Sequence, residues 1–377
     1  MRTIAFEPFD LPASERALRG EVRGFLAETI PGRSARQRAE SWMGMDRDFS
    51  RKMGARGWIG MTWPEKYGGH ERSFADRYVV IEEMLAAGAP VSFHWIADRQ
   101  SGPLLLRFGT EEQRQSILPR VARGEVCFCI GMSEPGAGSD LAGVRTRARK
   151  VDGGWRINGQ KIWTSNAHVA TYMIALVRTS EGERHAGLSQ LIVDMSSPGV
   201  AVKPIQNLTG AADFNEVFLD DVFVPDSMLV GKEGDGWRQV GAELAFERSG
   251  PERYLSSLRL FLEFLRIVGR SPSEAERLFI GEVTARMWTL RQMSLAITGK
   301  IIAGGDPASD AAMVKDLGVS LEQDIPAAIQ ALAPPAARDA SFEETLTYLL
   351  QSSPSFSLRG GTREILRGII ARELGLR

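Results

Sequence analysis

Two neighbouring glycines near the C-terminus mark the first stretch that could do chemistry. The segment "SFSLRGGTREILRGIIAREL" spans residues 355–374, and Gly360 and Gly361 precede an apolar-periodic run that Thr362 opens. Glycines at a loop-to-helix junction let the backbone approach a bound molecule and leave N–H groups to donate hydrogen bonds. Amides can polarise a substrate but cannot take a proton from it. A base must therefore come from another part of the chain.

A glutamate in an earlier helical stretch is the candidate base. In "ELAFERSGPERYL", residues 243–255, Glu247 lies in a predicted helix whose other members are mostly apolar. Loss of hydration beside apolar neighbours raises the pKa of a carboxyl group and suits it to general-base catalysis. Spacing alone favours a plainer interpretation, a solvated glutamate in a charge pair one helical turn away. Both interpretations stay open at this point.

A glycine-rich loop follows the first predicted strand. In "GMSEPGAGSDLAG", residues 131–143, Ser133, Ser139 and nearby amides supply hydrogen-bonding groups within a tight, irregular turn. Such a loop suits a flat polar ligand edge or a phosphate, although a plain strand-to-strand turn has the same composition. No strand–helix unit surrounds the loop, so it is not the dinucleotide-binding fingerprint.

An aromatic residue beside small polar groups ends the next predicted strand. In "GQKIWTSNA", residues 159–167, Trp163 is followed by Thr164, Ser165 and Asn166. The indole could cover one face of a planar heterocycle while the small polar groups bond its edge. The alternative is a core tryptophan at a strand end, and in isolation that alternative is favoured.

The hydrophobic period changes twice along the chain and predicts an α+β fold. Residues 1–122 have a helical period, with Ser14 and Thr110 as expected N-caps, whereas residues 123–230 form short alternating runs separated by turn clusters. The helical period returns over residues 231–377. This order predicts an N-terminal helical domain, a central antiparallel β-sheet domain and a C-terminal helical bundle. It differs from the alternating strands and helices of a Rossmann fold.

Composition narrows the class of protein. The 377 residues are 43% hydrophobic and 25% charged with a net charge of -1, so no global basic field for nucleic acid exists. Acidic residues interrupt the apolar runs well before membrane-spanning length, and the N-terminus lacks a signal-peptide core; we expect a cytoplasmic protein without membrane insertion.

Cys127 and Cys129, two apart on a predicted strand, have parallel side chains, so no disulfide is expected. The four histidines show no metal-ligand spacing, so no metal site is expected.

Five segments in the same order resemble the acyl-CoA dehydrogenase family over essentially the whole chain. "MSEPGAGSD" is similar to the first signature of the family, "KIWTSN" to its flavin-contacting strand, and "GGTREILRGIIAREL" to its C-terminal signature. "RGWIGMTWPEKYGG" and "RFGTEEQRQSILPRVARGE" resemble its N-terminal domain. One short motif would be weak support, but five in order are highly specific.

The resemblance implies FAD bound between the β domain and the C-terminal helices. By motif matching, Ser133 and the backbone around Met132 contact the flavin ring, Trp163 packs beside it, and Thr164 and Ser165 lie near its N5 edge. Ser139 is placed toward the CoA moiety or the ribityl phosphate, and Arg248 close to the acyl-CoA. The full set of implied cofactor-binding residues is Met132, Ser133, Gly138, Ser139, Trp163, Thr164, Ser165 and Thr362.

The resemblance also answers where the base lies. Many members of the family carry the catalytic glutamate where this chain has Gly360, whereas isovaleryl- and long-chain-like members carry it on the earlier helix, where this chain has Glu247. The implied reaction converts an acyl-CoA to a trans-2-enoyl-CoA: Glu247 takes the α-proton, flavin N5 takes the β-hydride, and an electron-transfer flavoprotein takes the electrons. The Gly360 amide would hold the thioester oxygen. Glu364, the nearby rival acid, is expected to be solvated at the start of the last helix.

This chain also departs from the family pattern in a segment that bears on subunit assembly. Homotetrameric relatives carry a "QxxGG" stretch that reaches the FAD of a neighbouring subunit, whereas this chain reads "AIQALAPPAARD" there, with Gln330 but no glycine pair. Prolines donate no amide hydrogen bond. Two assemblies follow from the resemblance, a homo-oligomer and an α2β2 complex with a paralogous subunit, and both stay open.

Two other functions remain possible on the same scaffold. A flavin monooxygenase or oxidase would let reduced flavin meet oxygen, but such an enzyme needs neither an α-proton base nor a CoA site. A non-catalytic partner subunit would have no use for the retained flavin motifs and Glu247. Both alternatives therefore rank below the dehydrogenase.

Overall fold

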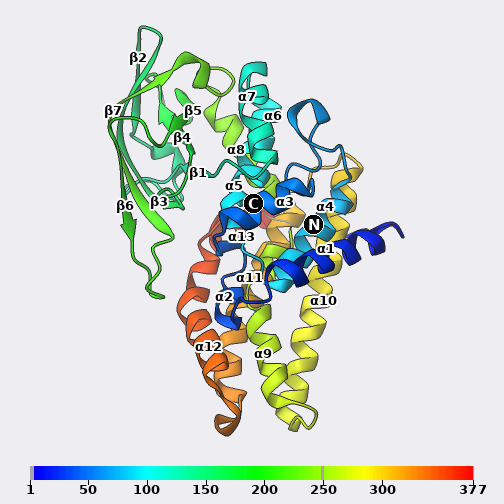
Figure 1. The fold of residues 1–377 in the computed structure, drawn as a ribbon. Helices are drawn as coiled ribbons and strands as arrows, with labels where there is room; N and C mark the ends of the chain where they lie inside the picture. Colours follow the sequence, from blue (N-terminus) through cyan, green and yellow to red (C-terminus); the bar gives the residue numbers. More distant parts are fainter. Residues whose placement is uncertain (1–3, 183, 248–249, 377) are drawn as a thin grey trace. The chain divides into compact units, whose positions relative to one another are not determined.

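The computed structural model describes residues 4–182, 184–247 and 250–376, and within it the chain forms two compact units (Figure 1). The helical unit comprises Met1–Met45, Arg72–Val91 and Ala245–Arg377; the mixed unit comprises Asp46–Glu71 and Ser92–Leu244. Each unit therefore gathers segments that are far apart in the sequence. The three-part division along the chain stays a prediction.

The mixed unit combines short helices with one sheet. Its helices are α3 (Arg47–Ala55), α5 (Ser92–Ile96), α6 (Gly102–Phe108) and α7 (Glu111–Ala122), with a π-helical turn, Ala97–Ser101, between α5 and α6. Helix α8 (Gly236–Glu247) begins in this unit, and its last residues belong to the helical unit. Its strands are β1 (Phe128–Gly131), β2 (Arg147–Val151), β3 (Gly154–Ser165), β4 (Tyr172–Arg178), β5 (Leu188–Asp194), β6 (Val200–Ile205) and β7 (Phe214–Pro225).

The sheet runs in the order β1-β4-β2-β3-β7-β6, with β5 paired to β4. The pairs β2–β3, β3–β7, β6–β7 and β4–β5 are antiparallel, as expected, but β1–β4 and β2–β4 are parallel. The β2–β3 hairpin explains the difference, because it returns the chain to the starting end of β1, where the Thr171 amide donates to the Cys127 carbonyl at 2.8 Å. The sheet is therefore mixed rather than wholly antiparallel.

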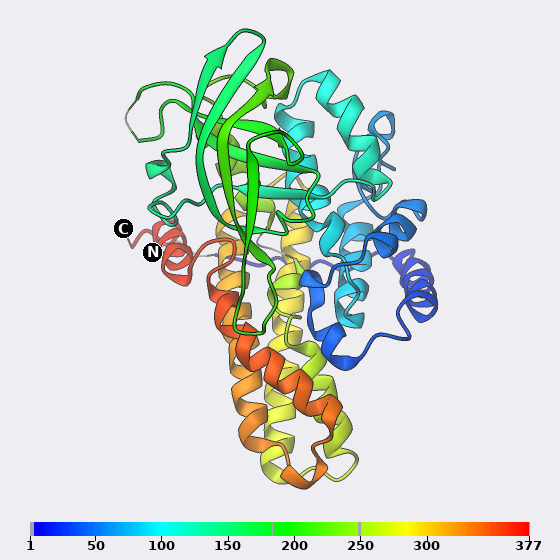
Figure 2. The same cartoon turned by 60° about the vertical axis from the view of Figure 1, so that its left-hand side comes forward.

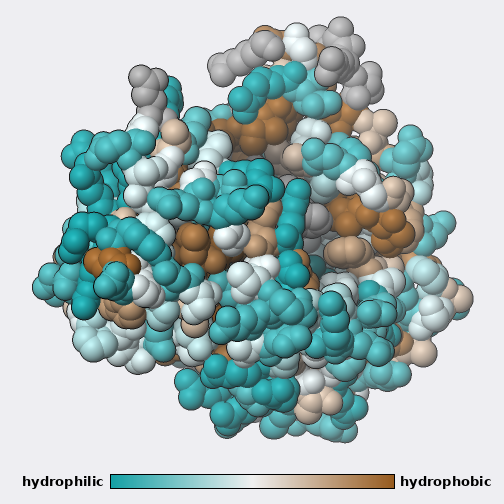
Figure 3. All heavy atoms as spheres, turned by 90° about the horizontal axis from the view of Figure 1, so that it is seen from above, coloured by the Kyte–Doolittle hydropathy of each residue, from teal (hydrophilic) through white to brown (hydrophobic). Residues whose placement is uncertain are grey.

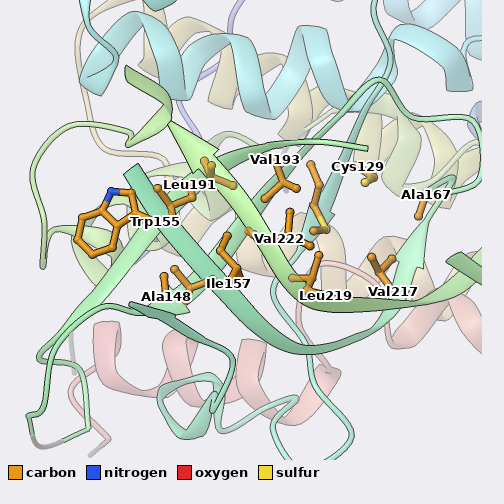
Figure 4. Close-up of a cluster of buried hydrophobic side chains, with 14 residues drawn as sticks. Cys129, Ala148, Trp155, Ile157, Ala167, Leu191, Val193, Val217, Leu219 and Val222 are labelled. Carbon is orange, nitrogen blue, oxygen red and sulfur yellow. The ribbon is translucent and has the colours of Figure 1, made fainter. Parts of the chain in front are cut away.

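Alternate residues of the strands build the core of the mixed unit (Figure 4). Trp155 and Ile157 of β3 pair with Val224 and Val222 of β7, and all four are buried. Since successive side chains of a strand point to opposite faces, residues two apart share this core. Cys129 of β1 belongs to the same cluster as a free thiol, and its burial raises its pKa, so it is inert packing.

The helical unit is built around long helices that lie side by side (Figure 2). Helix α11 packs against α9, α10, α12 and α13, while α1 packs against α4. The helices are α1 (Glu15–Thr29), α2 (Ala35–Ala39), α4 (Phe74–Ala87), α9 (Leu258–Val268), α10 (Glu274–Ile302), α11 (Ala308–Leu332), α12 (Ala340–Ser352) and α13 (Arg363–Glu373).

The two expected N-caps have different outcomes. Thr110 caps α7 as expected, because its hydroxyl accepts from the Gln113 amide while the Gln113 side chain accepts from the Thr110 amide. Ser14 makes no side-chain cap bond, because its backbone is itself in the helical region (φ −57°, ψ −24°) instead of the extended conformation that a cap needs. Ser14 therefore stands at the N-cap position of α1, as expected, but without the side-chain hydrogen bond of a cap.

The outer surface is mixed in character. Figure 3 shows a face that is largely hydrophilic, with hydrophobic side chains gathered in separate patches. Across the described part of the chain, no helix combines the length and the apolar character that crossing a membrane requires.

Candidate active site

The glycine-rich loop and the tryptophan-bearing strand, predicted separately, lie side by side in the mixed unit. The Ile162 amide of β3 donates to the Ser133 carbonyl at 2.9 Å. One residue earlier, the Lys161 ammonium donates to the Met132 carbonyl at 3.2 Å. The backbone of the loop is therefore fixed against the part of β3 that leads into Trp163.

Trp163 stands on an irregular, strained part of β3. The pairing of β3 with β7 shifts register between Lys161 and Thr164, and Trp163 has a φ of 58°. A bulky non-glycine residue in the left-handed region is costly, and such strain gathers at functional sites. Trp163 is 58% exposed, and its indole makes an edge-to-face contact with the ring of Phe214, 6.4 Å between centroids. The bulge therefore presents a flat aromatic face rather than packing it in the core.

Thr164, the next residue of β3, has a buried hydroxyl without a hydrogen-bond partner. The residue is 1% exposed, and its Oγ1 has no hydrogen-bond partner. Its carbonyl is held by the Asn215 side-chain amide at 3.0 Å, so the backbone position is fixed. A buried hydroxyl without a partner costs about 1–3 kcal/mol. The exposed indole of Trp163 fits one face of a planar heterocycle, such as an isoalloxazine ring.

The other predicted residues of this unit lie around the same loop and strand. Ser133 and Ser165 are half-buried, whereas Gly138 and Ser139 are exposed. A Cβ added at Gly138 would meet no atom within 4 Å, so its lack of a side chain leaves open space at the surface of the loop. Ser139 directly follows that open position. All four residues are thus at least partly accessible to a ligand.

Two charged residues that sequence reasoning missed hold the loop. The Lys161 Nζ lies 2.7 Å from Oε1 of Glu134, and both side chains are buried. Burial lowers the pKa of Lys161 to about 8, although Glu134 opposes that shift. Burial alone would raise the pKa of Glu134, but the Lys161 ammonium and hydrogen bonds more than offset it and the net pKa is lowered. The pair is therefore ionised at neutral pH. A lysine within an alternating strand was the available signal.

In the helical unit, the Gly360–Gly361 turn has the loop-to-helix character expected of it. Their φ angles are 66° and 100°, a region that favours glycine, and Thr362 follows as the N-cap residue of α13. The buried Lys315 ammonium of α11 donates to the Gly361 carbonyl. The turn is therefore anchored to α11 by a charged hydrogen bond.

Arg359, directly before the turn, is anchored to the same helix. Its guanidinium donates to the Ser256 hydroxyl at 2.8 Å and to Oε2 of Glu322 at 3.3 Å, and it also lies over the rings of Trp42 and Phe356. Burial lowers the pKa of Arg359 to about 10, an effect that Glu322 partly offsets. Sequence reasoning missed this contact, since residues 322 and 359 are joined only by the fold.

The proposed base falls at the edge of the described structure. Glu247 is the last residue of α8, but its side chain and Arg248 lie outside the described residues. The assignments of Glu247 as base and of Arg248 to the acyl-CoA therefore stay predictions. Glu364 is exposed in the first turn of α13, and hydrogen bonds to its carboxylate lower its pKa.

Comparison with known proteins places the chain in a family. The model of the acyl-CoA dehydrogenase N-terminal domain matches residues 12–125, and that of the middle domain matches residues 129–222. Acyl-CoA dehydrogenase IpdE1 of Mycobacterium tuberculosis is 36% identical over 376 residues, covering 95% of this chain and 97% of that protein. The chain belongs to the acyl-CoA dehydrogenase family. A rice mitochondrial isovaleryl-CoA dehydrogenase is 28% identical and covers 96% of this chain and 90% of the relative.

Solved structures of acyl-CoA dehydrogenases share the fold. The "Tcur3481-Tcur3483 steroid ACAD" has a TM-score of 0.86 at 29% identity, covering 97% of this chain and 98% of that one. The ChsE4-ChsE5 complex of Mycobacterium tuberculosis gives 0.84 at 30% identity, with both chains fully covered. These likenesses confirm the expected fold class of helical, β and helical regions.

Family membership identifies the chemistry of the candidate site. The chain is an acyl-CoA dehydrogenase, a flavoprotein oxidoreductase of lipid metabolism that acts on CH–CH groups, and its cofactor is FAD. The exposed, flat indole of Trp163 is compatible with the flavin ring of that cofactor. The residues of the mixed unit therefore agree with the cofactor that the family requires.

Proposed function

We propose that this chain oxidises an acyl-CoA thioester to a trans-2-enoyl-CoA with Glu247 as the α-proton base. The observation that carries the proposal is the combination of Trp163, exposed on a strained bulge, with the unpartnered Thr164 hydroxyl in a chain of this family. Bound FAD supplies the acceptor for the β-hydride.

The protein's own groups account for the rest of the reaction. A thioester α-proton is only weakly acidic, so its removal needs both a base and a place for the negative charge on oxygen. Glu247 takes the proton, while the Gly360 amide donates to the thioester oxygen; losing one such donor typically costs ~3 kcal/mol of barrier. Lys315 and Arg359 support this step by anchoring the residues on either side of Gly360. Arg248 contributes to binding of the acyl-CoA.

One solved relative supports a proposal for the substrate class. The solved structure named a steroid acyl-CoA dehydrogenase covers nearly the whole chain, and a base on the earlier helix is compatible with long, branched or bulky acyl groups. We therefore propose a bulky acyl chain, of the kind a steroid side chain presents, rather than a short straight one.

A substrate panel tests this function. The FAD-loaded protein is mixed anaerobically with short, long, branched and steroid side-chain acyl-CoAs while loss of the oxidised-flavin absorbance is followed. We expect bleaching by bulky acyl-CoAs with formation of the trans-2-enoyl product, and slow reoxidation by air. Rapid reoxidation by air without enoyl product would instead identify an oxidase or monooxygenase.

The end of α11 supports assembly with a different subunit. The Arg338 guanidinium donates to the carbonyls of Gln330, at 2.6 Å, and Ala333, at 3.0 Å, so it caps the last turn of the helix. Pro334 and Pro335 follow and have no backbone N–H to donate. This segment is thus closed on its own chain, where homotetrameric relatives are expected to present glycines to a neighbour. The ChsE4-ChsE5 structure is a complex of two differently named proteins.

We accordingly propose an α2β2 assembly with a paralogous subunit. We also propose an electron-transfer flavoprotein as the partner that accepts electrons from the enzyme. Expression of this chain alone, with light-scattering mass and flavin content as readouts, tests the assembly. We expect substoichiometric flavin without the partner. A homo-oligomer with full, tightly bound FAD would contradict the heteromeric assembly while leaving the dehydrogenase reaction intact.

A further inference from the structure

We propose that Lys161 and Glu134 are positioning residues for FAD, because their buried ion pair fixes the glycine-rich loop against the Trp163 bulge. The inference depends on FAD binding beside that loop and not on the identity of the base. It concerns two side chains to which no role in the reaction has been assigned above.

Lys161 joins three separate segments at one atom. The residue is 0% exposed, and its Nζ donates to the Met132 carbonyl in the loop, to the Leu176 carbonyl in β4 at 2.6 Å and to Glu134 at 2.7 Å. An ammonium group has three donors, so this set satisfies all of them. The position of the Lys161 side chain therefore determines where the loop begins relative to the sheet.

Glu134 closes the loop from its other side. Its two oxygens accept from the backbone amides of Arg145, at 2.6 Å, and Thr146, at 2.9 Å, which follow the loop just before β2. Within the loop, Glu134 and Ala137 exchange backbone hydrogen bonds at 2.9 and 3.0 Å. One carboxylate thus ties the entry of the loop to its exit, and the residues between them, including Gly138, are held as a closed turn.

The ion pair lies directly next to the proposed flavin contacts. Lys161 is the last paired residue before the bulge that carries Trp163, and Thr164 resumes the pairing with β7 after it. Ser133, one residue from Glu134, accepts the Ile162 amide. A displacement of the pair would therefore move the loop relative to both the indole and the Thr164 hydroxyl.

Energetics favour a positioning role over a purely stabilising one. Taking two charges out of water costs several kcal/mol per ion, and exchanging a buried pair for apolar residues of similar volume is often neutral or stabilising. Hydrogen bonds are directional, so the pair fixes the orientation of the segments that it joins, which apolar packing would not do. A contribution to stability therefore explains the buried pair poorly. Positioning of the three backbone segments that it joins explains it better.

The test is the double variant Lys161→Met with Glu134→Gln, which leaves no isolated buried charge. The matched control is Gln113→Met, since Gln113 is also buried and also donates to two carbonyls, those of Ser227 and Leu229, away from the loop. Each apoprotein is titrated with FAD by fluorescence quenching, and the bound flavin is recorded by visible circular dichroism. Thermal melting of the apoproteins measures the purely structural effect.

We expect the double variant to bind FAD at least about tenfold more weakly, with an altered flavin dichroism, while the control stays within about twofold of wild type at a comparable loss of melting temperature. Wild-type affinity and dichroism in a folded double variant would overturn the proposal. Should the double variant not fold, Glu134→Gln alone decides: Lys161 keeps its two carbonyl acceptors there, and we expect a threefold or larger loss of FAD affinity. An unchanged affinity in that single variant would equally overturn it.

Discussion

At the scale of single residues, Trp163 and Thr164 each destabilise the folded chain without contributing to folding itself. One holds a left-handed backbone and an exposed indole, and the other buries a hydroxyl without a partner. Backbone strain and unsatisfied polar groups are tolerated mainly at functional sites, where binding of a ligand can offset their free-energy cost. We therefore propose that these two residues couple the strain of β3 to binding of the flavin.

Thr164→Val separates the two effects, because valine keeps the shape and removes the hydroxyl. We expect the apoprotein to melt at an equal or higher temperature, since an unsatisfied buried group is lost, while FAD binds about fivefold more weakly for the loss of roughly 1 kcal/mol of hydrogen bonding. Differential scanning fluorimetry and FAD titration measure the two quantities. Parallel losses in both would show that the hydroxyl serves the fold and not the ligand.

At the scale of elements, α11 holds the C-terminal turn from one face. Lys315 and Glu322 are seven residues apart, so they recur on the same side of the helix and reach Gly361 and Arg359. Between them, Asp316 accepts from Arg363 at 3.1 Å. The turn that carries Gly360 is thus fixed by charged contacts and not by apolar packing alone.

Glu322→Gln tests this anchoring, because it leaves the largely buried Arg359 without its carboxylate. We expect a loss of roughly 3 kcal/mol in the free energy of unfolding of the helical unit. Asp324→Asn is the control on the same helix, since the Arg286–Asp324 pair is exposed and such pairs contribute at most about 1 kcal/mol. Urea denaturation followed by circular dichroism gives both values; equal losses in the two variants would refute the special role of Glu322.

The sequence was sufficient for most elements and for part of the site. The period of the apolar residues predicted helices and strands, and the Thr110 cap followed from local chemistry. The Lys161–Glu134 pair could not be predicted, because it depends on the register of β3 against a loop 27 positions earlier. The bulge at Trp163 depends in the same way on pairing with β7. Contacts set by strand register are invisible to residue spacing along one segment.

At the scale of the whole molecule, one buried acid couples folding to pH. Glu15 of α1 is 3% exposed and neither carboxylate oxygen has a hydrogen-bond partner. Burial, followed by repulsion from Asp76, raises its pKa to about 7. Because the folded protein then binds this proton more tightly than the unfolded chain, the contribution of Glu15 to stability falls as pH rises from about 4.5 to about 7.

Glu15→Gln removes that titration while keeping the shape. We expect the melting temperature of the variant, relative to wild type, to increase steadily from pH 5 to about pH 7.5 and to level off above it, since the glutamate is charged only there. Parallel melting curves across a pH series provide the measurement. A difference that stays constant with pH would mean that the Glu15 carboxyl keeps an ordinary pKa.

The central claim is that Glu247 removes the α-proton, and single-turnover flavin reduction in Glu247→Gln tests it most directly. FAD affinity is measured first and should match wild type, and Glu364→Gln is the matched control, because Glu364 is the exposed rival acid. With a saturating acyl-CoA under anaerobic conditions, we predict that Glu247→Gln reduces flavin about 10²–10⁴-fold more slowly, while Glu364→Gln reduces it at the wild-type rate. Normal bleaching in Glu247→Gln, or loss of bleaching in Glu364→Gln alone, would contradict the account.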